Sequence, residues 1–156
     1  MSEIKLARID SRLSHGKMVE SFSKKLDIDT VIIANDDLYQ DEFRKDLMDL
    51  TIPDDIRAFY LKIDMVRDFL ASHKEDVFLI VENAKDLEDL RNQGIRIKEI
   101  NIGIIHMSIG KKALTEEVAV DSDDLRIFKE FMDEGCNLYV RLSPYSQRME
   151  LHSLLN

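Results

Sequence analysis

The sequence predicts a three-layer α/β/α fold in which helices cover both faces of an open, mainly parallel sheet of about six to seven strands. Two observations favour this class. Short runs of β-branched and other apolar residues recur along the chain, and a stretch with helical spacing of apolar residues follows most of them. Strands that alternate with helices pair in parallel through right-handed crossovers. The length of 156 residues suits one domain with a sizeable core, so we expect a single domain over residues 1–156.

The N-terminal half contains four expected strands, each followed by an expected helix. The strands are expected at residues 4–9, 30–34, 56–61 and 77–81. The last of these is nearly all apolar, which is typical of a central strand. Residues 18–26 and 63–70 have helical spacing, and a further helix is expected between Asn83 and Gly94. One longer helix is expected to follow an N-cap at residues 35–37 and to carry Leu38, Phe43, Leu47 and Leu50.

The C-terminal half continues the alternation less regularly. Strands are expected at residues 99–102, 118–120 and 137–142, and residues 103–117 have no clear pattern. Residues 121–122 cap an expected helix that ends at Gly135. Residues 144–156 form a C-terminal tail, expected as a short helix with an apolar side. The apolar residues of this tail are Met149, Leu151, Leu154 and Leu155. Two roles stay open for the tail: packing on the domain, and self-association into a homo-oligomer.

Composition and charge argue against several classes of protein. The net charge of −9 argues against non-specific nucleic-acid binding. No apolar stretch is long enough to span a bilayer, and residues 1–6 lack the apolar core of a signal peptide. The single cysteine, Cys136, leaves no internal disulfide and fits a reducing cytoplasm. Four scattered histidines and one cysteine do not give a metal-ligand spacing, so we expect no metal and no cofactor.

The segment after the first strand is the strongest candidate for chemistry. It lies beyond the carboxyl end of a strand and before a helix, where α/β proteins place their ligands. The segment is locally basic, with Arg8, Arg12 and Lys17, and it contains His15 and Gly16. A neutral imidazole can attack phosphorus, an arginine can clamp phosphate oxygens, and a glycine lets the backbone approach closely. The position of His15 supports two roles equally. The residue either accepts a phosphoryl group or simply lies on a polar loop.

Neighbouring residues extend this hypothesis. Asp10 is expected either to orient the imidazole or to hold Arg12, and a loop-capping role is an equal alternative. Ser14 can donate to phosphate, although a local turn role is favoured for it. Lys17 adds a positive charge that can help to hold phosphate. Asn35 follows the second strand at the same sheet edge, where a helix cap is the favoured role.

The segments that surround these residues resemble one family over nearly the whole chain except the tail. Residues 8–19 read RIDSRLSHGKMV, and residues 31–48 read VIIANDDLYQDEFRKDLM. Residues 77–103 and 110–135 follow in the same order. Together they resemble the IIB subunits of the mannose–fructose–sorbose family of the phosphoenolpyruvate-dependent sugar phosphotransferase system.

The resemblance implies a cytoplasmic phosphocarrier that associates peripherally with a membrane permease. Such a subunit takes a phosphoryl group from a phosphohistidine on IIA and passes it to a sugar held by the IIC/IID complex. It is a protein-Npi-phosphohistidine–sugar phosphotransferase, an activity also grouped with the kinases. The family's transferring histidine maps to His15, and the motif's arginine and first acid map to Arg12 and Asp10. The resemblance also places the segment with His106 near the active loop, although a surface or partner-contact role is favoured for His106 over a role in the site.

Departures from the family pattern keep an alternative open. Ser11, Ser14 and Lys17 replace a common acid, a common aliphatic residue and a common glutamine. None of these changes removes a reacting group, but they leave room for a regulatory or binding paralogue that does not phosphorylate sugar. A histidine phosphatase or mutase ranks last, because it needs arginine where Ser14 stands. Phosphocysteine IIB classes are excluded, because Cys136 lies far from the first loop.

Overall fold

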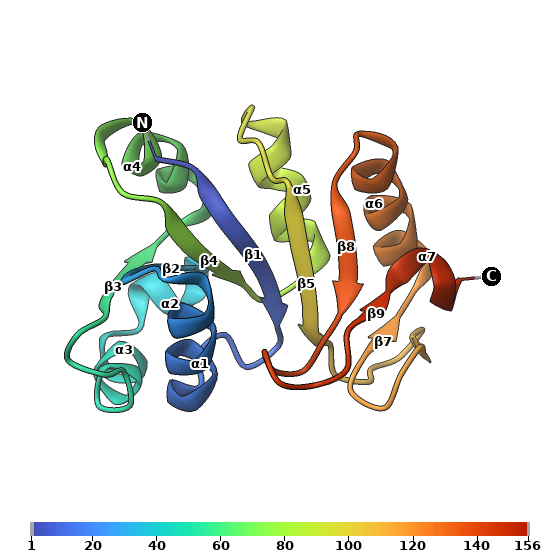
Figure 1. Cartoon of the computed structure of the whole chain (residues 1–156), viewed down its shortest axis with the longest axis horizontal. Helices are drawn as coiled ribbons and strands as arrows, with labels where there is room; N and C mark the ends of the chain where they lie inside the picture. The colour runs from blue at the N-terminus through green and yellow to red at the C-terminus, as the bar shows by residue number, and fades with distance from the viewer. Residues whose placement is uncertain (1, 156) are drawn as a thin grey trace.

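In residues 2–155, which the computed structural model describes, seven strands form one sheet with the order β3-β2-β4-β1-β5-β8-β9 (Figure 1). Adjacent strands are parallel, except that β9 runs antiparallel to β8. The strands are β1 (Ile4–Asp10), β2 (Thr30–Ala34), β3 (Arg57–Leu61), β4 (Val77–Val81), β5 (Glu99–Ile104), β8 (Asn137–Val140) and β9 (Met149–Glu150). The predicted open, mainly parallel sheet is confirmed.

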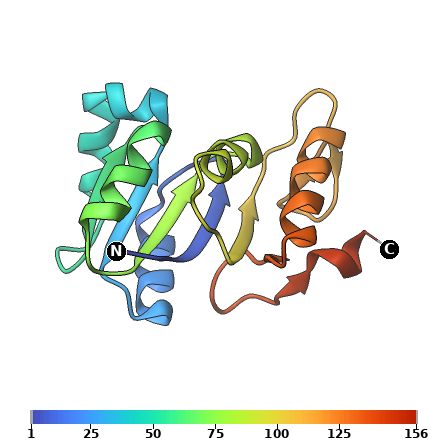
Figure 2. The same cartoon turned by 90° about the horizontal axis from the view of Figure 1, so that it is seen from above.

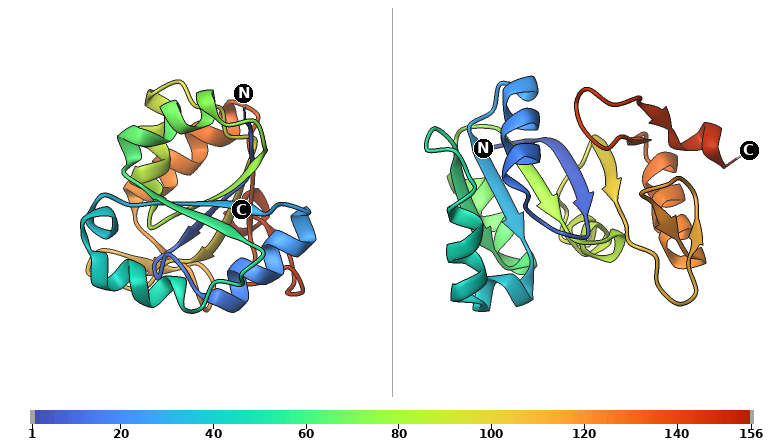
Figure 3. Two further views of the ribbon diagram at one scale, coloured as in Figure 1. Left: turned by 90° about the vertical axis from the view of Figure 1, so that its left-hand side faces the viewer. Right: turned by 90° about the horizontal axis from the view of Figure 1, so that it is seen from below.

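Helices cover both faces of the sheet, which confirms the three-layer prediction (Figure 3). The helices are α1 (Gly16–Leu26), α2 (Asp36–Gln40), α3 (Glu42–Asp49), a 3-10 turn η1 (Ile63–Met65), α4 (Val66–Ser72), α5 (Ala84–Asn92), α6 (Ser122–Asp133) and α7 (Leu151–Leu154). The core on one face contains buried residues of α4, α5 and α6, and the core on the other contains those of α1, α2 and α3. Within the described residues, none of the helices is long and apolar enough to cross a membrane.

The helix expected over residues 38–50 is two helices. The chain breaks at Asp41, whose side chain accepts a hydrogen bond from the Arg44 amide at 3.0 Å and so caps α3. Only part of the expected apolar face is buried. Phe43, Leu47 and Leu50 are 74%, 48% and 82% exposed, because the residues of α2 and α3 that meet the core are Leu38 and Met48.

The C-terminal third corrects two further predictions. The short strand expected at residues 118–120 is present as β7 (Ala119–Val120), but it lies outside the seven-stranded sheet and pairs with β6 (Lys112–Ala113) in an antiparallel ribbon. A single parallel bridge between Val118 and Ile105 connects this ribbon to the residue after β5. The seventh strand of the sheet is β9, in the segment expected to be a helical tail. A helix begins only at Leu151, which is fully buried. The described tail therefore packs on the domain, and Figure 2 shows α7 at the end of the molecule opposite α2 and α3.

Candidate functional site

The loop between β1 and α1 is held in one conformation by backbone hydrogen bonds and a buried leucine. The Leu13 amide donates to the Asp10 carbonyl at 2.8 Å, and the Ser11 amide donates to the Ile104 carbonyl at 2.9 Å. Leu13 has a φ of 65°, which is uncommon for a residue with a branched side chain. Its side chain is fully buried in the core that α1 covers. Burial of Leu13 therefore stabilises a turn that its backbone alone disfavours.

Asp10 holds Arg12. The Asp10 carboxylate is fully buried and accepts from the Arg12 backbone amide at 2.9 Å, from Nε at 3.1 Å and from Nη2 at 3.1 Å. This two-point pairing fixes the plane of the guanidinium, while the Arg12 side chain stays 36% exposed. Of the three roles predicted for Asp10, these contacts support two: its carboxylate holds the Arg12 guanidinium, and it caps the loop through the Arg12 backbone amide.

Arg8 lies beneath this pair, where sequence analysis did not place it. The sequence predicts Arg8 as one of the cations of a basic loop, but the residue is fully buried. Its Nη2 pairs with Asp10 at 3.2 Å, and its Nη1 donates to Oδ1 of buried Asn101 at 2.6 Å. Burial lowers the pKa of Arg8 from its ordinary value, and the Asp10 carboxylate opposes that shift. Arg8 therefore anchors Asp10 and is not a free cation for a ligand.

A signal for Arg8 is present in the sequence. The residue stands between Ala7 and Ile9 inside an apolar strand, and a buried guanidinium needs buried partners. The identity of those partners does not follow from spacing. Asn101 comes from β5, which lies beside β1 only because the chain crosses over β1 after β4.

His15 is the N-cap residue of α1, and its side chain makes no capping hydrogen bond. The imidazole is exposed. The first turn of α1 contains no acidic residue, whereas α2, α3, α5 and α6 each have an acidic first turn and an Asn or Asp side chain as cap. The first amides of a helix have no partner within the helix and attract anions. The α1 N-terminus thus leaves its amides open next to an exposed histidine.

A pocket of about 360 Å³ lies at this helix start. Ser14, His15, Gly16 and Lys17 line one side of it, and Arg44, Leu47, Met48 and Thr51 of α3 and the following turn line the other. The Ser14 hydroxyl is buried and has no hydrogen-bond partner in the part of the chain that the structure describes. A Cβ on Gly16 would lie 2.2 Å from the Thr51 carbonyl oxygen, so glycine allows the two segments to meet.

The remaining predicted residues lie at the same edge of the sheet but outside this pocket. The backbone amide of His106 donates to the Ser11 hydroxyl at 3.0 Å, and its exposed imidazole lines a neighbouring pocket with Ser11 and Asn83. Asn35 is buried and caps α2, accepting from the Leu38 amide at 2.8 Å. The structure thus brings His106 to the first loop and gives Asn35 the capping role.

Comparison with known proteins agrees with this architecture. Residues 4–156 match the family described as PTS system sorbose subfamily IIB component, so the match includes the tail that we expected to fall outside it. The chain is 32% identical over 147 residues to the fructose-specific EIIB component of Bacillus subtilis, covering 92% of this chain and 90% of that protein. It is 28% identical over 156 residues to the mannose-specific EIIAB component of Escherichia coli, covering 98% of this chain and 48% of that protein.

Among solved structures, the crystal structure of the IIBSor domain of the sorbose permease from Klebsiella pneumoniae superposes with a TM-score of 0.87 at 30% identity. The alignment covers 99% of this chain and 96% of that one. The family match, the EIIB relatives and the shared fold lead to one conclusion. The chain belongs to the sorbose-type IIB components of the sugar phosphotransferase system, a family of phosphotransferases that serves sugar uptake.

Proposed function

We propose that His15 accepts a phosphoryl group from a phosphorylated IIA partner and passes it to a sugar held by a IIC/IID membrane permease. One observation carries the proposal: an exposed imidazole stands at an acid-free helix N-terminus, in the same loop as an arginine that a buried carboxylate holds. Each of these features suits a dianionic group that is bound for a short time and then released.

The chemistry needs little beyond positioning and charge stabilisation. A ring nitrogen of neutral His15 attacks phosphorus, and the bond from phosphorus to the donor histidine breaks as the new N–P bond forms. Arg12, Lys17 and the first amides of α1 supply the positive field for the phosphoryl oxygens. The buried Ser14 hydroxyl can donate to one of these oxygens, which would give it the partner that it lacks among the described residues. In the second step a sugar hydroxyl oxygen attacks phosphorus and the N–P bond to His15 breaks. The hydroxyl loses its proton and the released imidazole regains one, which restores neutral His15.

The surroundings of the site support docking by protein partners. On the α3 side, Phe43, Leu47 and Leu50 are exposed at helical spacing, and Leu47 lines the same pocket as His15. On the other side, Met107 and Ile109 follow His106 and are 60% and 104% exposed. Apolar side chains grouped around a polar centre are typical of protein-binding surfaces. The Escherichia coli mannose relative is named EIIAB, which supports a IIA domain as one partner.

The test is phosphoryl transfer from phosphoenolpyruvate through the general carriers and the cognate IIA. Intact mass measured under alkaline conditions preserves an acid-labile phosphohistidine. We expect the wild type to gain one phosphate and His15→Ala to gain none. His106→Ala, His73→Ala and His152→Ala are the matched controls and should still gain one. If the wild type stays unmodified with an active IIA, or His15→Ala is still phosphorylated, the proposal is wrong. An unmodified wild type would favour a regulatory paralogue instead.

The role of Arg12 can be separated from that of His15. Arg12→Lys keeps the charge but loses the two-point pairing with Asp10. We expect this variant to reach the same final phosphorylation at a rate about tenfold lower, because positioning of the phosphoryl oxygens is impaired. An unchanged rate would show that Arg12 does not contact the transferred group.

A further inference from the structure

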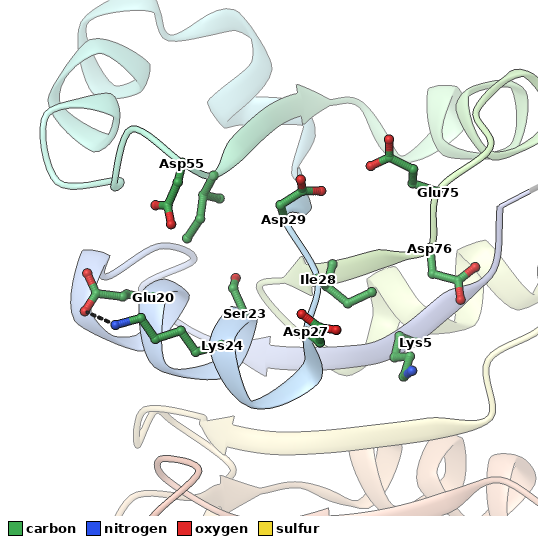
Figure 4. Close-up of a pocket in the computed structure, with 11 residues that line it drawn as sticks. Lys5, Glu20, Ser23, Lys24, Asp27, Ile28, Asp29, Asp55, Glu75 and Asp76 are labelled. Carbon is green, nitrogen blue, oxygen red and sulfur yellow. Dashed lines mark ion pairs between the residues drawn. The ribbon is translucent and has the colours of Figure 1, made fainter.

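A pocket lined mainly by acidic residues lies at the amino edge of the sheet, near the end of α1 that is remote from His15. Its volume is about 610 Å³, within the range of small-molecule sites. Residues that precede or begin β1, β2, β3 and β4 meet the last turns of α1 there (Figure 4). The acidic lining residues are Glu20, Asp27, Asp29, Asp55, Glu75 and Asp76, against only two lysines, Lys5 and Lys24.

Three of these six carboxylates pair with a cation. Lys24 pairs with Glu20 at 3.8 Å, and Arg57 from β3 reaches both Asp29 and Glu75. Asp27 and Asp55 make no ion pair or side-chain hydrogen bond with any residue in the described part of the chain. The pocket is therefore strongly negative, and it disfavours phosphates and other anions.

A buried hydroxyl in the pocket can accept a hydrogen bond from a ligand. Ser23 of α1 is only 4% exposed, and its oxygen has no hydrogen-bond partner among the described residues. Figure 4 shows this side chain directed from α1 into the pocket, on the side that faces Asp55. A buried hydroxyl without a partner is unfavourable, so a donor supplied by a ligand would remove the deficit.

The end of α1 adds to the preference for a cation. Asp27 caps the C-terminus of α1 in a left-handed conformation with φ 56°, and the C-terminal end of a helix carries partial negative charge. Ile28 and Ile56 lie among the carboxylates and provide apolar contact. In the described chain, no three acidic, histidine or cysteine side chains are close enough to ligate one metal ion. The charges are spread along the pocket, which suits a ligand with several separated cations.

We propose that this pocket binds a linear aliphatic polyamine. Its ammonium groups donate to Asp27, Asp55 and the Ser23 hydroxyl, and its methylene segments lie against Ile28 and Ile56. The binding involves no phosphoryl group, so it can be tested on the unphosphorylated protein and can fail independently of the role of His15.

The experiment is calorimetric titration of the unphosphorylated full chain with spermidine at constant ionic strength. We expect saturable binding of one spermidine per chain. Asp27→Asn combined with Asp55→Asn should weaken the affinity about tenfold or more, because two charge-assisted hydrogen bonds are lost. Glu116→Gln combined with Asp133→Asn changes the net charge equally at a distance from the pocket and should leave the affinity within about twofold.

Ser23→Ala gives a second readout that general charge attraction does not predict. Removing the partnerless hydroxyl should raise the melting temperature of the free protein, whereas the additional rise caused by spermidine should shrink. Two results would overturn the proposal: spermidine binding that does not saturate, or an equal loss of affinity in the pocket and control double variants. A third result would do the same: Mg²⁺ at equal ionic strength that abolishes spermidine binding. That outcome would show attraction to a diffuse ion atmosphere and not binding at a site.

Discussion

Gly103→Ala tests whether the buried Arg8 organises the first loop. Gly103 lies in β5, and a Cβ there would be 2.2 Å from the Arg8 Cζ atom and 2.4 Å from Nη2. The backbone of Gly103 is not in the left-handed region, so alanine meets no conformational penalty at this position. The whole effect of the substitution should therefore come from displacing the Arg8 guanidinium.

The size of the effect follows from what the guanidinium contacts. Arg8 pairs with Asp10, donates to Asn101, and donates to the carbonyls of Arg141 and Leu142. The Arg8 and Asp10 side chains are both fully buried, and separating a buried ion pair costs about 3–5 kcal/mol. With a urea dependence of about 2 kcal/mol per molar, the unfolding midpoint should fall by about 1.5–2.5 M.

The assay is equilibrium urea unfolding of the wild type and four variants: Gly103→Ala, Gly94→Ala, Arg8→Met, and Arg8→Met combined with Gly103→Ala. Gly94→Ala is the matched control: it introduces the same methyl group at φ +87° with no atom within 4 Å, so only backbone strain of about 1–2 kcal/mol is expected. In an Arg8→Met background the atoms that clash are absent, and Gly103→Ala should then cost less than about 1 kcal/mol more.

Two outcomes would refute this reasoning. The first is a cost for Gly103→Ala that is no larger than that for Gly94→Ala. The second is an equal cost of Gly103→Ala in the wild-type and Arg8→Met backgrounds, which would show that the new methyl group clashes with something other than the guanidinium. Either result would remove Arg8 as the support of Asp10 and, through it, of Arg12.

Three further substitutions probe the site and the pH dependence of the fold. Gly16→Ala should cost about 2 kcal/mol in urea unfolding and slow phosphorylation of His15, because its Cβ would overlap the Thr51 carbonyl. Ser14→Ala should stabilise the unphosphorylated protein by about 1 kcal/mol, since it removes a buried hydroxyl that lacks a partner in the described chain, yet slow transfer. Burial raises the pKa of Asp86 to about 6, so its ionised form destabilises the native state above that pH, and the penalty fades as pH falls toward 4. Asp86→Asn should therefore raise stability by about 1 kcal/mol at pH 7.5, after solvent screening, and by almost nothing at pH 4; an equal gain at both values would contradict this.

The sheet was largely predictable from the sequence, because its strands are short apolar runs whose burial demands that pattern. The strand at residues 77–81 is an example: all five residues are buried in the structure. The helical character of residues 38–50 was predictable from apolar spacing, but the break at Asp41 and the exposure of the apolar face were not. Phe43, Leu47 and Leu50 have the periodicity of a core face, but they lie on the solvent side of α3 near the pocket of His15. Helical spacing of apolar residues indicates that a helix has an apolar face. It does not indicate whether the core of the same chain or another protein covers that face.

The candidate site was predictable to the extent that its residues are neighbours in sequence. His15, Arg12 and Asp10 are close along the chain, and the end of a first parallel strand is a favoured place for ligands. The supports of the site come from distant segments: Asn101 and Gly103 from β5, and Thr51 from the turn after α3. Their roles depend on which strands and loops become neighbours, and strand order does not follow from local pattern.

The buried polar cluster beneath the loop is better explained by function than by stability. A well-packed apolar set in place of Arg8, Asp10 and Asn101 would be about as stable or more so, because desolvation offsets most of the gain from a buried ion pair. Such a set could not hold Arg12, whose three hydrogen bonds to Asp10 fix it at the surface. A phosphocarrier needs cations that are already in position when each partner docks, since reorganisation during transfer would raise the barrier. The cluster thus maintains an ordered arginine on a loop that is otherwise open to solvent.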